Sequence, residues 1–222
     1  MMTKKFCVIG NPINHSLSPK IQNYWFQKNK IDSIYEKKFI QEHELEEFVK
    51  SIRKEYITGA NVTVPFKQKI IPFLDEISDL SKKTQSVNTI YKKNNLLIGD
   101  NTDVYGFVQS IKSHNINLEN KDALILGGGG VVPSIISALE LLSIKKIFLS
   151  NRTFDRIKEL KKRYPNIELI DWGKMVHFDI VVNATSVGLK INDKLDLNFD
   201  NLKGNKIFYD TIYNPPMTNF LK

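Results

Sequence analysis

The sequence predicts an α/β protein of two domains, each with a mainly parallel sheet. Helix-like and strand-like segments alternate from end to end, and such alternation favours parallel strands joined by helices. A chain of 222 residues, of which 41% are hydrophobic, can bury one sizeable core or two small ones. We place the domains at 1–102 and 103–222, with a helix beginning near Asp103 between them.

Local patterns locate the elements of the first domain. Apolar residues recur at spacings of three and four from Leu45 to Ile52, which predicts a helix with one apolar face over 42–54. An earlier helix opens at Ser18, with that serine as its cap and Pro19 in its first turn. Strands are expected at 6–10, 34–40, 59–64, 87–91 and 96–98, the last two as a hairpin.

The second domain has the more regular pattern. Its apolar stretches form a series of strand, helix and strand units, which is typical of a Rossmann-type domain. Strands are expected at 123–126, 146–150, 167–170, 180–184 and 207–209, and helices at 132–142 and 154–164.

Composition narrows the function classes. The single cysteine, Cys7, lies in an apolar run, so we expect a buried free thiol, no disulfide and a reducing compartment. Residues 1–5 lead straight into a strand without a signal segment, and no run approaches the ~20 apolar residues that span a bilayer. These features predict a cytoplasmic protein without a membrane partner.

The net charge of +8 raises the possibility of a nucleic-acid partner. The lysines, however, occur in pairs spread along the chain, such as Lys4–Lys5 and Lys145–Lys146, rather than in one stripe. This distribution favours a solvated surface, and a nucleic-acid role would require binding that falls steeply with salt.

A run of four glycines, Gly127–Gly130, follows an apolar strand and precedes an apolar helix. Glycines there let the backbone approach a pyrophosphate, whose charge is met by amides at the helix N-terminus. Gly127 and Gly129 fit the first two positions of G-x-G-x-x-G, whereas Val132 occupies the third. A tight connection without a ligand is the alternative.

The next strand ends in Ser150-Asn151-Arg152-Thr153, followed by Arg156, with no acidic residue before Asp155. An NAD site usually has an acidic residue here for the ribose hydroxyls, whereas a guanidinium pairs with a 2′-phosphate. The sequence therefore predicts NADP(H) as cofactor. The small polar residues 183–186, after a later strand, either border the nicotinamide or cap a turn.

Polar clusters also mark element ends in the first domain. Ser16 and Ser18 lie two residues apart at a helix entrance, where amides favour a bound carboxylate, although Ser18 could be a plain cap. Further clusters follow at 61–67, 87–89 and 99–103, where loop composition is the alternative explanation.

Together these stretches resemble the shikimate dehydrogenase family over the whole chain from Phe6. The resemblance is carried by 10–19 (GNPINHSLSP), 61–67 (NVTVPFK), 86–89 (SVNT), 99–103 (GDNTD), 151–153 (NRT), 183–186 (NATS) and 213–215 (YNP). It implies reversible NADPH-dependent reduction of 3-dehydroshikimate to shikimate in aromatic amino-acid biosynthesis, by a monomer or homodimer without a metal.

The resemblance also implies roles for individual residues. Lys67 and Asp103 are the expected catalytic pair, with Asp103 across the interdomain cleft. The substrate carboxylate is expected at Ser16, Ser18 and Tyr213, and the ring oxygens at Thr63, Lys67, Asn88 and Asp103. The expected cofactor residues are Asp79, Gly127, Gly128, Gly129, Gly130, Val131, Asn151, Arg152, Thr153, Arg156, Thr185 and Thr211.

The residue types suit this chemistry. Hydride delivered to a ketone leaves an alkoxide, which needs a proton donor and a positive charge within hydrogen-bond reach. Lys67 can supply both. Members of the family continue past the position of Lys222 with helices that carry a substrate-binding glutamine and a glycine contacting the cofactor, so we expect weakened substrate affinity here.

Two other functions fit parts of the pattern. A quinate or quinate/shikimate dehydrogenase shares the scaffold and often prefers NAD, which Arg152 disfavours. A non-catalytic NADP-binding sensor would have little use for Lys67 and Asp103 together with the paired serines.

Overall fold

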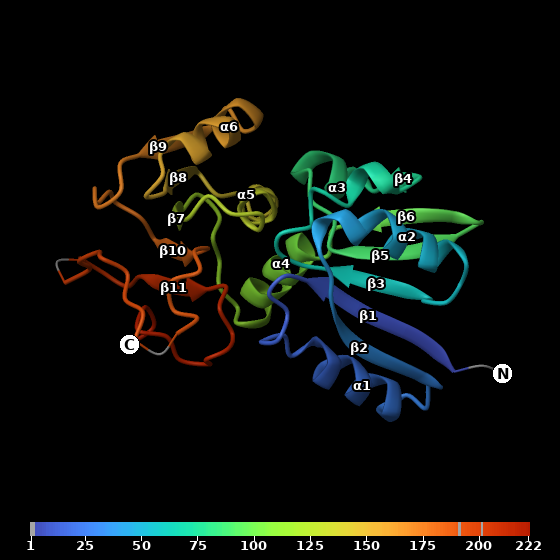
Figure 1. Cartoon of the computed structure of the whole chain (residues 1–222). Coiled ribbons are helices and arrows are strands. Elements are labelled where there is room, and N and C mark those ends of the chain that lie inside the picture. The colour runs from blue at the N-terminus through green and yellow to red at the C-terminus, as the bar shows by residue number, and fades with distance from the viewer. Residues whose placement is uncertain (1–2, 191, 201) are drawn as a thin grey trace. The chain divides into compact units, whose positions relative to one another are not determined.

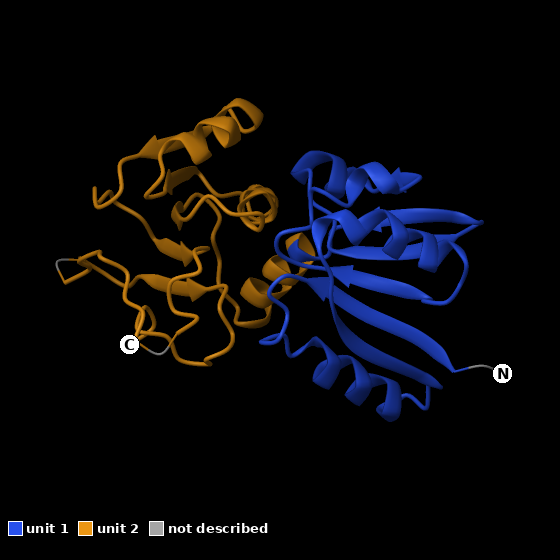
Figure 2. Cartoon of the chain, in the orientation of Figure 1, with its two compact units in different colours: residues 1–103 blue, residues 104–222 orange. Residues whose placement is uncertain are grey.

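The computed structural model describes residues 3–190, 192–200 and 202–222. The chain divides into two compact units, residues 1–103 and 104–222 (Figure 2). The division falls one residue after the one expected from the sequence, so that Asp103 belongs to the first unit. Its carboxylate is bound by side chains of that unit, as described below.

The first unit is built on a six-stranded sheet. Its strands are β1 (Lys4–Gly10), β2 (Ser33–Phe39), β3 (Gly59–Val62), β4 (Glu76–Ile77), β5 (Thr89–Lys93) and β6 (Leu96–Asp100). They lie in the order β2-β1-β3-β5-β6-β4 (Figure 1). Strand β5 runs antiparallel to both of its neighbours, and the other pairings are parallel. The mainly parallel sheet is therefore confirmed, with one reversed strand near its middle.

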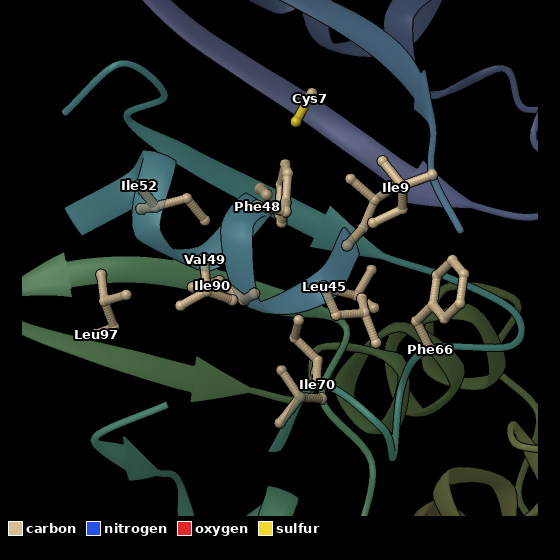
Figure 3. Packing of buried hydrophobic residues seen from close by; sticks show 14 residues of the cluster. Cys7, Ile9, Leu45, Phe48, Val49, Ile52, Phe66, Ile70, Ile90 and Leu97 are labelled. Carbon is tan, nitrogen blue, oxygen red and sulfur yellow. The ribbon is translucent and has the colours of Figure 1, made fainter. Parts of the chain in front are cut away.

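Helix α2 (Leu45–Arg53) places its apolar face in the core of this unit. Leu45, Phe48, Val49 and Ile52 are all buried, as their spacing predicts. Figure 3 shows them among residues of the sheet, including Ile9 and Ile90. A 3₁₀ turn, Glu42–Glu44, precedes the helix and accounts for the earlier start expected from the sequence.

The segment 71–84 contains elements that the sequence did not reveal. They are a 3₁₀ turn (Ile71–Phe73), strand β4 and the six-residue helix α3 (Asp79–Thr84). None is long enough to show a periodic spacing of apolar residues. Helix α3 is capped by Ser78, whose side chain accepts the Ser81 N–H at 3.2 Å.

The second unit has a five-stranded, wholly parallel sheet in the order β11-β10-β7-β8-β9. Its strands are β7 (Asp122–Leu126), β8 (Lys146–Ser150), β9 (Ile167–Ile170), β10 (Ile180–Asn183) and β11 (Ile207–Asp210). Its helices are α4 (Asp103–Ser113), whose first residue belongs to the first unit, α5 (Val132–Leu141) and α6 (Asp155–Arg163). The predicted Rossmann-type arrangement is confirmed, because each element lies within two residues of its expected bounds and β7 is central.

Two expectations from composition can be compared with the structure. Cys7 is buried and free, and burial raises the pKa of its thiol to about 12, which suits a small hydrophobic residue. Among the described residues, no helix has the length and apolarity needed to cross a membrane. The same residues contain no group of three or more potential metal ligands.

Candidate active site

One edge of the first sheet collects the polar clusters of this unit. Strands β1, β3 and β6 end at this edge, because all three point the same way. Strand β5 is reversed, so it begins there, and the preceding residue, Asn88, lies at the same edge. The carboxyl edge of a parallel sheet is where α/β proteins usually bind ligands.

Lys67 and Asp103 meet at this edge. Lys67 Nζ lies 2.6 Å from Asp103 Oδ2, and the two side chains are only 13% and 25% exposed. The backbone of each is held in place: the carbonyl of Lys67 accepts the Val87 N–H at 2.8 Å, and Asn101 Oδ1 accepts the Asp103 N–H at 3.0 Å. The expectation that Asp103 faces Lys67 across an interdomain cleft is wrong, because both residues belong to the first unit. Their contact forms a preorganised ion pair within it.

Asn88 holds the other oxygen of the carboxylate. Its Nδ2 donates to Asp103 Oδ1 at 2.7 Å and to Thr102 Oγ1 at 2.9 Å, while its Oδ1 accepts the Thr102 N–H at 2.9 Å. Because a backbone N–H can only donate, the amide orientation of Asn88 is fixed. Asp103 is thereby bound on both sides.

The paired serines form a local turn at the start of α1 (Ser18–Lys28). The prediction that Ser18 caps this helix is wrong: Ser18 is the first helical residue, and Leu17 occupies the cap position without a side-chain bond. Instead, Ser16 Oγ accepts the Ser18 N–H at 3.3 Å and donates to Ser18 Oγ at 3.1 Å. The two hydroxyls are thus adjacent, as a shared ligand would require.

Thr63 lies against the end of β1. Its N–H donates to the carbonyl of Ile9 at 2.9 Å, and a Cβ added at Gly10 would lie 2.6 Å from Thr63 Cγ2. Glycine at position 10 therefore allows this close approach, which holds the half-buried Thr63 at the ligand edge.

Two further residues expected to bind ligands, Asp79 and Tyr213, are largely exposed to solvent. Asp79 begins α3 with a side chain that is 99% exposed and lies 3.2 Å from Lys82 Nζ. Tyr213 belongs to the second unit and is 56% exposed.

The glycine run forms the turn between β7 and α5. Gly127 has φ +121°, donates its N–H to the carbonyl of Ser150 at 2.8 Å, and would place a Cβ 2.7 Å from the carbonyl oxygen of Ala184. An added Cβ at Gly130 would meet nothing within 4 Å, and at Gly129 only the Ala184 oxygen at 3.9 Å. Gly127 is therefore required by the fold, whereas Gly129 and Gly130 leave room beside the start of a ten-residue helix, as a pyrophosphate needs.

Substitutions in this turn should separate the two roles of its glycines. We expect Gly127→Ala to lower the free energy of unfolding by about 2–4 kcal/mol, because it combines a left-handed backbone with a clash against Ala184. Gly130→Ala is the matched control and should change stability by less than about 0.5 kcal/mol while raising the KM for NADP. Chemical denaturation of both variants measures the difference, and equal stabilities would contradict this account.

The loop after β8 lies beside this turn. A Cβ added at Gly128 would come 3.3 Å from Asn151 Cγ, and Asn151 Nδ2 donates to the carbonyl of Thr153 at 2.8 Å. Arg152, Thr153 and Arg156 are exposed. Asp155, the first residue of α6, lies 2.7 Å from Lys158 in the same helix, which holds the Asp155 pKa below its usual range. The strand end thus presents cationic side chains.

The residues after β10 are organised by Asn183, whose role the sequence did not reveal. It is fully buried; its Oδ1 accepts the Thr185 hydroxyl at 2.8 Å, and its carbonyl accepts the Thr211 hydroxyl at 2.9 Å. Its Nδ2 donates to Asp210 Oδ1 at 3.1 Å. Thr185 also accepts the Val187 N–H at 3.0 Å, so these polar residues form a turn, and their place beside the nicotinamide stays a prediction. The sequence feature that could have indicated this role of Asn183 is its position as a polar residue at the end of an apolar strand.

Val131 takes the cap position of α5 in αR geometry, without a side-chain bond. Val132, in place of the third motif glycine, is fully buried as the first residue of the helix. Valine at this position therefore packs in the buried part of the helix and does not fill the space beside the glycine turn.

Two family models match the chain. The model described as "Shikimate dehydrogenase substrate binding domain" matches residues 8–90, and that described as "Shikimate / quinate 5-dehydrogenase" matches residues 108–210. The chain belongs to the shikimate dehydrogenase family. The resemblance drawn from the sequence motifs is thereby confirmed, and the two family domains correspond to the two units of the structure.

Similar proteins from other organisms bear the family name. A protein of Pelagibacter ubique named "Shikimate dehydrogenase (NADP(+))" is 56% identical over 221 residues, which cover 100% of this chain and 83% of the relative. The crystal structure of shikimate dehydrogenase from Aquifex aeolicus has a TM-score of 0.91 at 36% identity, covering 99% of this chain and 82% of that one. That from Thermus thermophilus, in complex with NADP(H) and shikimate, has a TM-score of 0.89 at 29% identity, covering 98% and 82%.

Proposed function

We propose that this chain catalyses the reversible NADPH-dependent reduction of 3-dehydroshikimate to shikimate. The observation that carries the proposal is the 2.6 Å contact between Lys67 and Asp103, held by Asn88 at the ligand edge of the first sheet. The names of the relatives and their NADP specificity agree with it. It follows that the chain is an oxidoreductase acting on a CH–OH group.

Lys67 is the proposed proton donor and acceptor. Bound NADPH supplies a hydride to the carbonyl carbon, and the Nζ of Lys67 donates a proton to the oxygen on which negative charge develops. In the oxidation of shikimate the same nitrogen receives the hydroxyl proton. Asp103 Oδ2 fixes the position of Nζ, so little reorganisation is needed when the charge develops.

The substrate is proposed to span the edge of the sheet. The adjacent hydroxyls of Ser16 and Ser18 would donate to its carboxylate, together with Tyr213, whereas Thr63 would bind a ring oxygen. Asn88 would bind another ring oxygen by exchanging its Thr102 Oγ1 partner for it, because both Nδ2 protons are already donated. The carboxylate would also benefit from the amides at the start of the eleven-residue helix α1.

The cofactor is proposed to lie on the glycine turn, with the 2′-phosphate at Arg152. Gly127–Gly130 and Val131 would contact the pyrophosphate, Asn151, Thr153 and Arg156 would complete the phosphate site with Arg152, and Asp79, Thr185 and Thr211 would line the remainder. The open space at Gly130 and the absence of an acidic residue at the end of β8 support this assignment.

A spectrophotometric assay tests the proposal. Shikimate or quinate is supplied at up to millimolar concentration with NADP or NAD, and formation of the reduced cofactor is followed at 340 nm. We expect reduction of NADP with shikimate as the preferred pair. Preference for quinate with NAD would favour a quinate dehydrogenase, and NADP binding without turnover would favour a sensor. A cytoplasmic location and a monomeric or dimeric state stay predictions.

A further inference from the structure

A line of polar side chains runs behind Asn88, through residues that the proposed reaction does not use. The hydroxyl of Tyr35 on β2 lies 2.6 Å from Asn61 Oδ1 on β3. Asn61 Nδ2 lies 3.0 Å from Thr89 Oγ1 on β5, and Thr89 Oγ1 lies 3.0 Å from Asn88 Oδ1. Asn88 Nδ2 then reaches Asp103 Oδ1 at 2.7 Å. The line therefore ends on the carboxylate that binds Lys67.

All hydrogen bonds in this line point the same way. Asn61 Nδ2 also donates to the carbonyl of Asn88 at 3.1 Å, and since a carbonyl only accepts, the orientation of the Asn61 amide is fixed. Asn61 Oδ1 must then accept from Tyr35, and Thr89 must accept from Asn61 and donate to Asn88. Burial raises the pKa of Tyr35 above its usual range, so its hydroxyl remains a donor.

The far end of the line is tied to helix α1. Asn23 Oδ1 accepts the Tyr35 N–H at 2.9 Å, and Asn23 Nδ2 donates to the Tyr35 carbonyl at 2.8 Å. The helix that presents Ser18 and the carboxylate of Asp103 are thus connected through four strand-borne or strand-adjacent polar residues. Tyr35 links the two, since its backbone is bonded to α1 and its hydroxyl begins the line that ends at Asp103.

We propose that Asn61 and Thr89 are positioning residues for the reaction and act through Asn88. Hydrogen bonds aligned from donor to acceptor polarise one another, so the chain strengthens the donation from Asn88 to Asp103 Oδ1. Asp103 then keeps Oδ2 turned toward Lys67. Thr89 is the residue to test, because among the described contacts its hydroxyl is the only link between Asn61 Nδ2 and Asn88 Oδ1. The inference rests on the proposed function.

Thr89→Val tests the role, since it removes the hydroxyl and keeps the shape and strand preference of the side chain. We expect kcat for shikimate oxidation to fall about five- to tenfold, as for loss of one net hydrogen bond, with the KM for NADP unchanged. Thr89→Ser, which restores the hydroxyl, should recover most of the turnover. Equal impairment of Thr89→Val and Thr89→Ser would overturn the proposal.

A double-mutant cycle separates positioning from a merely structural effect. If Thr89 acts through Asn88, Thr89→Val should cause no further loss in the Asn88→Ala background. The same five- to tenfold loss in that background would show that Thr89 acts independently of Asn88, and would refute the proposal. Thermal unfolding of each variant verifies that the compared proteins are folded.

A spectroscopic measurement is independent of turnover. The side-chain amide signals of Asn88, assigned by their disappearance in Asn88→Ala, should lie downfield in the ¹⁵N-labelled protein because both protons are donated. They should move upfield in Thr89→Val and stay near their original position in Thr89→Ser. Unmoved signals would refute the positioning role, whereas moved signals in a protein without shikimate oxidation would refute only the proposed function.

Discussion

Replacing Lys67 by methionine should lower kcat for shikimate oxidation by about a thousandfold, within the range for loss of general acid–base catalysis. Methionine preserves an unbranched apolar stem but has no proton to transfer and no charge to stabilise the alkoxide. The side chain of Lys67 is only 13% exposed and directly contacts Asp103, so water is poorly placed to substitute for it. The steady-state rate at saturating shikimate and NADP measures the effect.

The coupling between Lys67 and Asp103 provides the control for this prediction. Because one carboxylate oxygen binds Nζ directly, Lys67→Ala and Asp103→Ala should be strongly non-additive in turnover. A double variant whose loss is the product of the two single losses would argue against a shared proton-transfer unit. NADP affinity, measured by fluorescence titration, should stay close to that of the unmodified chain in both single variants.

Removing Arg152 should abolish most of the preference for NADP over NAD. A charge-assisted hydrogen bond contributes about 1.5–3 kcal/mol, so Arg152→Ala should reduce the ratio of kcat/KM for NADP to that for NAD by about ten- to hundredfold. The loss should fall on the KM for NADP, since the 2′-phosphate is remote from the transferred hydride. Activity with NAD should change little.

Lys162→Ala is a matched control for Arg152→Ala. Lys162 lies in the last turn of α6, is well exposed and pairs with Glu159 at 2.7 Å, so its removal changes the net charge equally without touching the loop after β8. The cofactor ratio should be unchanged in this variant. If both substitutions lower the ratio alike, the preference arises from overall charge rather than from a guanidinium at the 2′-phosphate.

The long, periodic elements could be predicted from the sequence, and the short ones could not. The apolar spacing of α2 and the strand and helix series of the second unit were sufficient, because burying one face requires that periodicity. Strand β4 and helix α3 were not predicted, since they are held by contacts between residues distant in sequence. One such contact is the hydrogen bond that the Ser78 hydroxyl donates to Asp100 Oδ1 at 2.5 Å.

The local motif at the start of α1 led to a wrong prediction of the residue that caps this helix. A serine before proline at a helix start is a strong sign of a cap, yet Ser18 is already helical and Ser16 accepts its N–H. Which of two neighbouring hydroxyls satisfies a free amide depends on the path of the preceding loop, and that path is not encoded in the spacing.

By itself, the sequence determined the chemical groups available to this protein: an amine at Lys67, carboxylate and amide partners, adjacent hydroxyls, and a glycine turn followed by arginine. Tertiary structure alone decided which of them touch. Reversal of β5 brings Asn88 to the edge where Asp103 lies, and the register of β3 with β5 sets Asn61 opposite Thr89. Hydrogen bonds need partners within about 3 Å, and only strand pairing fixes such distances between residues far apart in the chain.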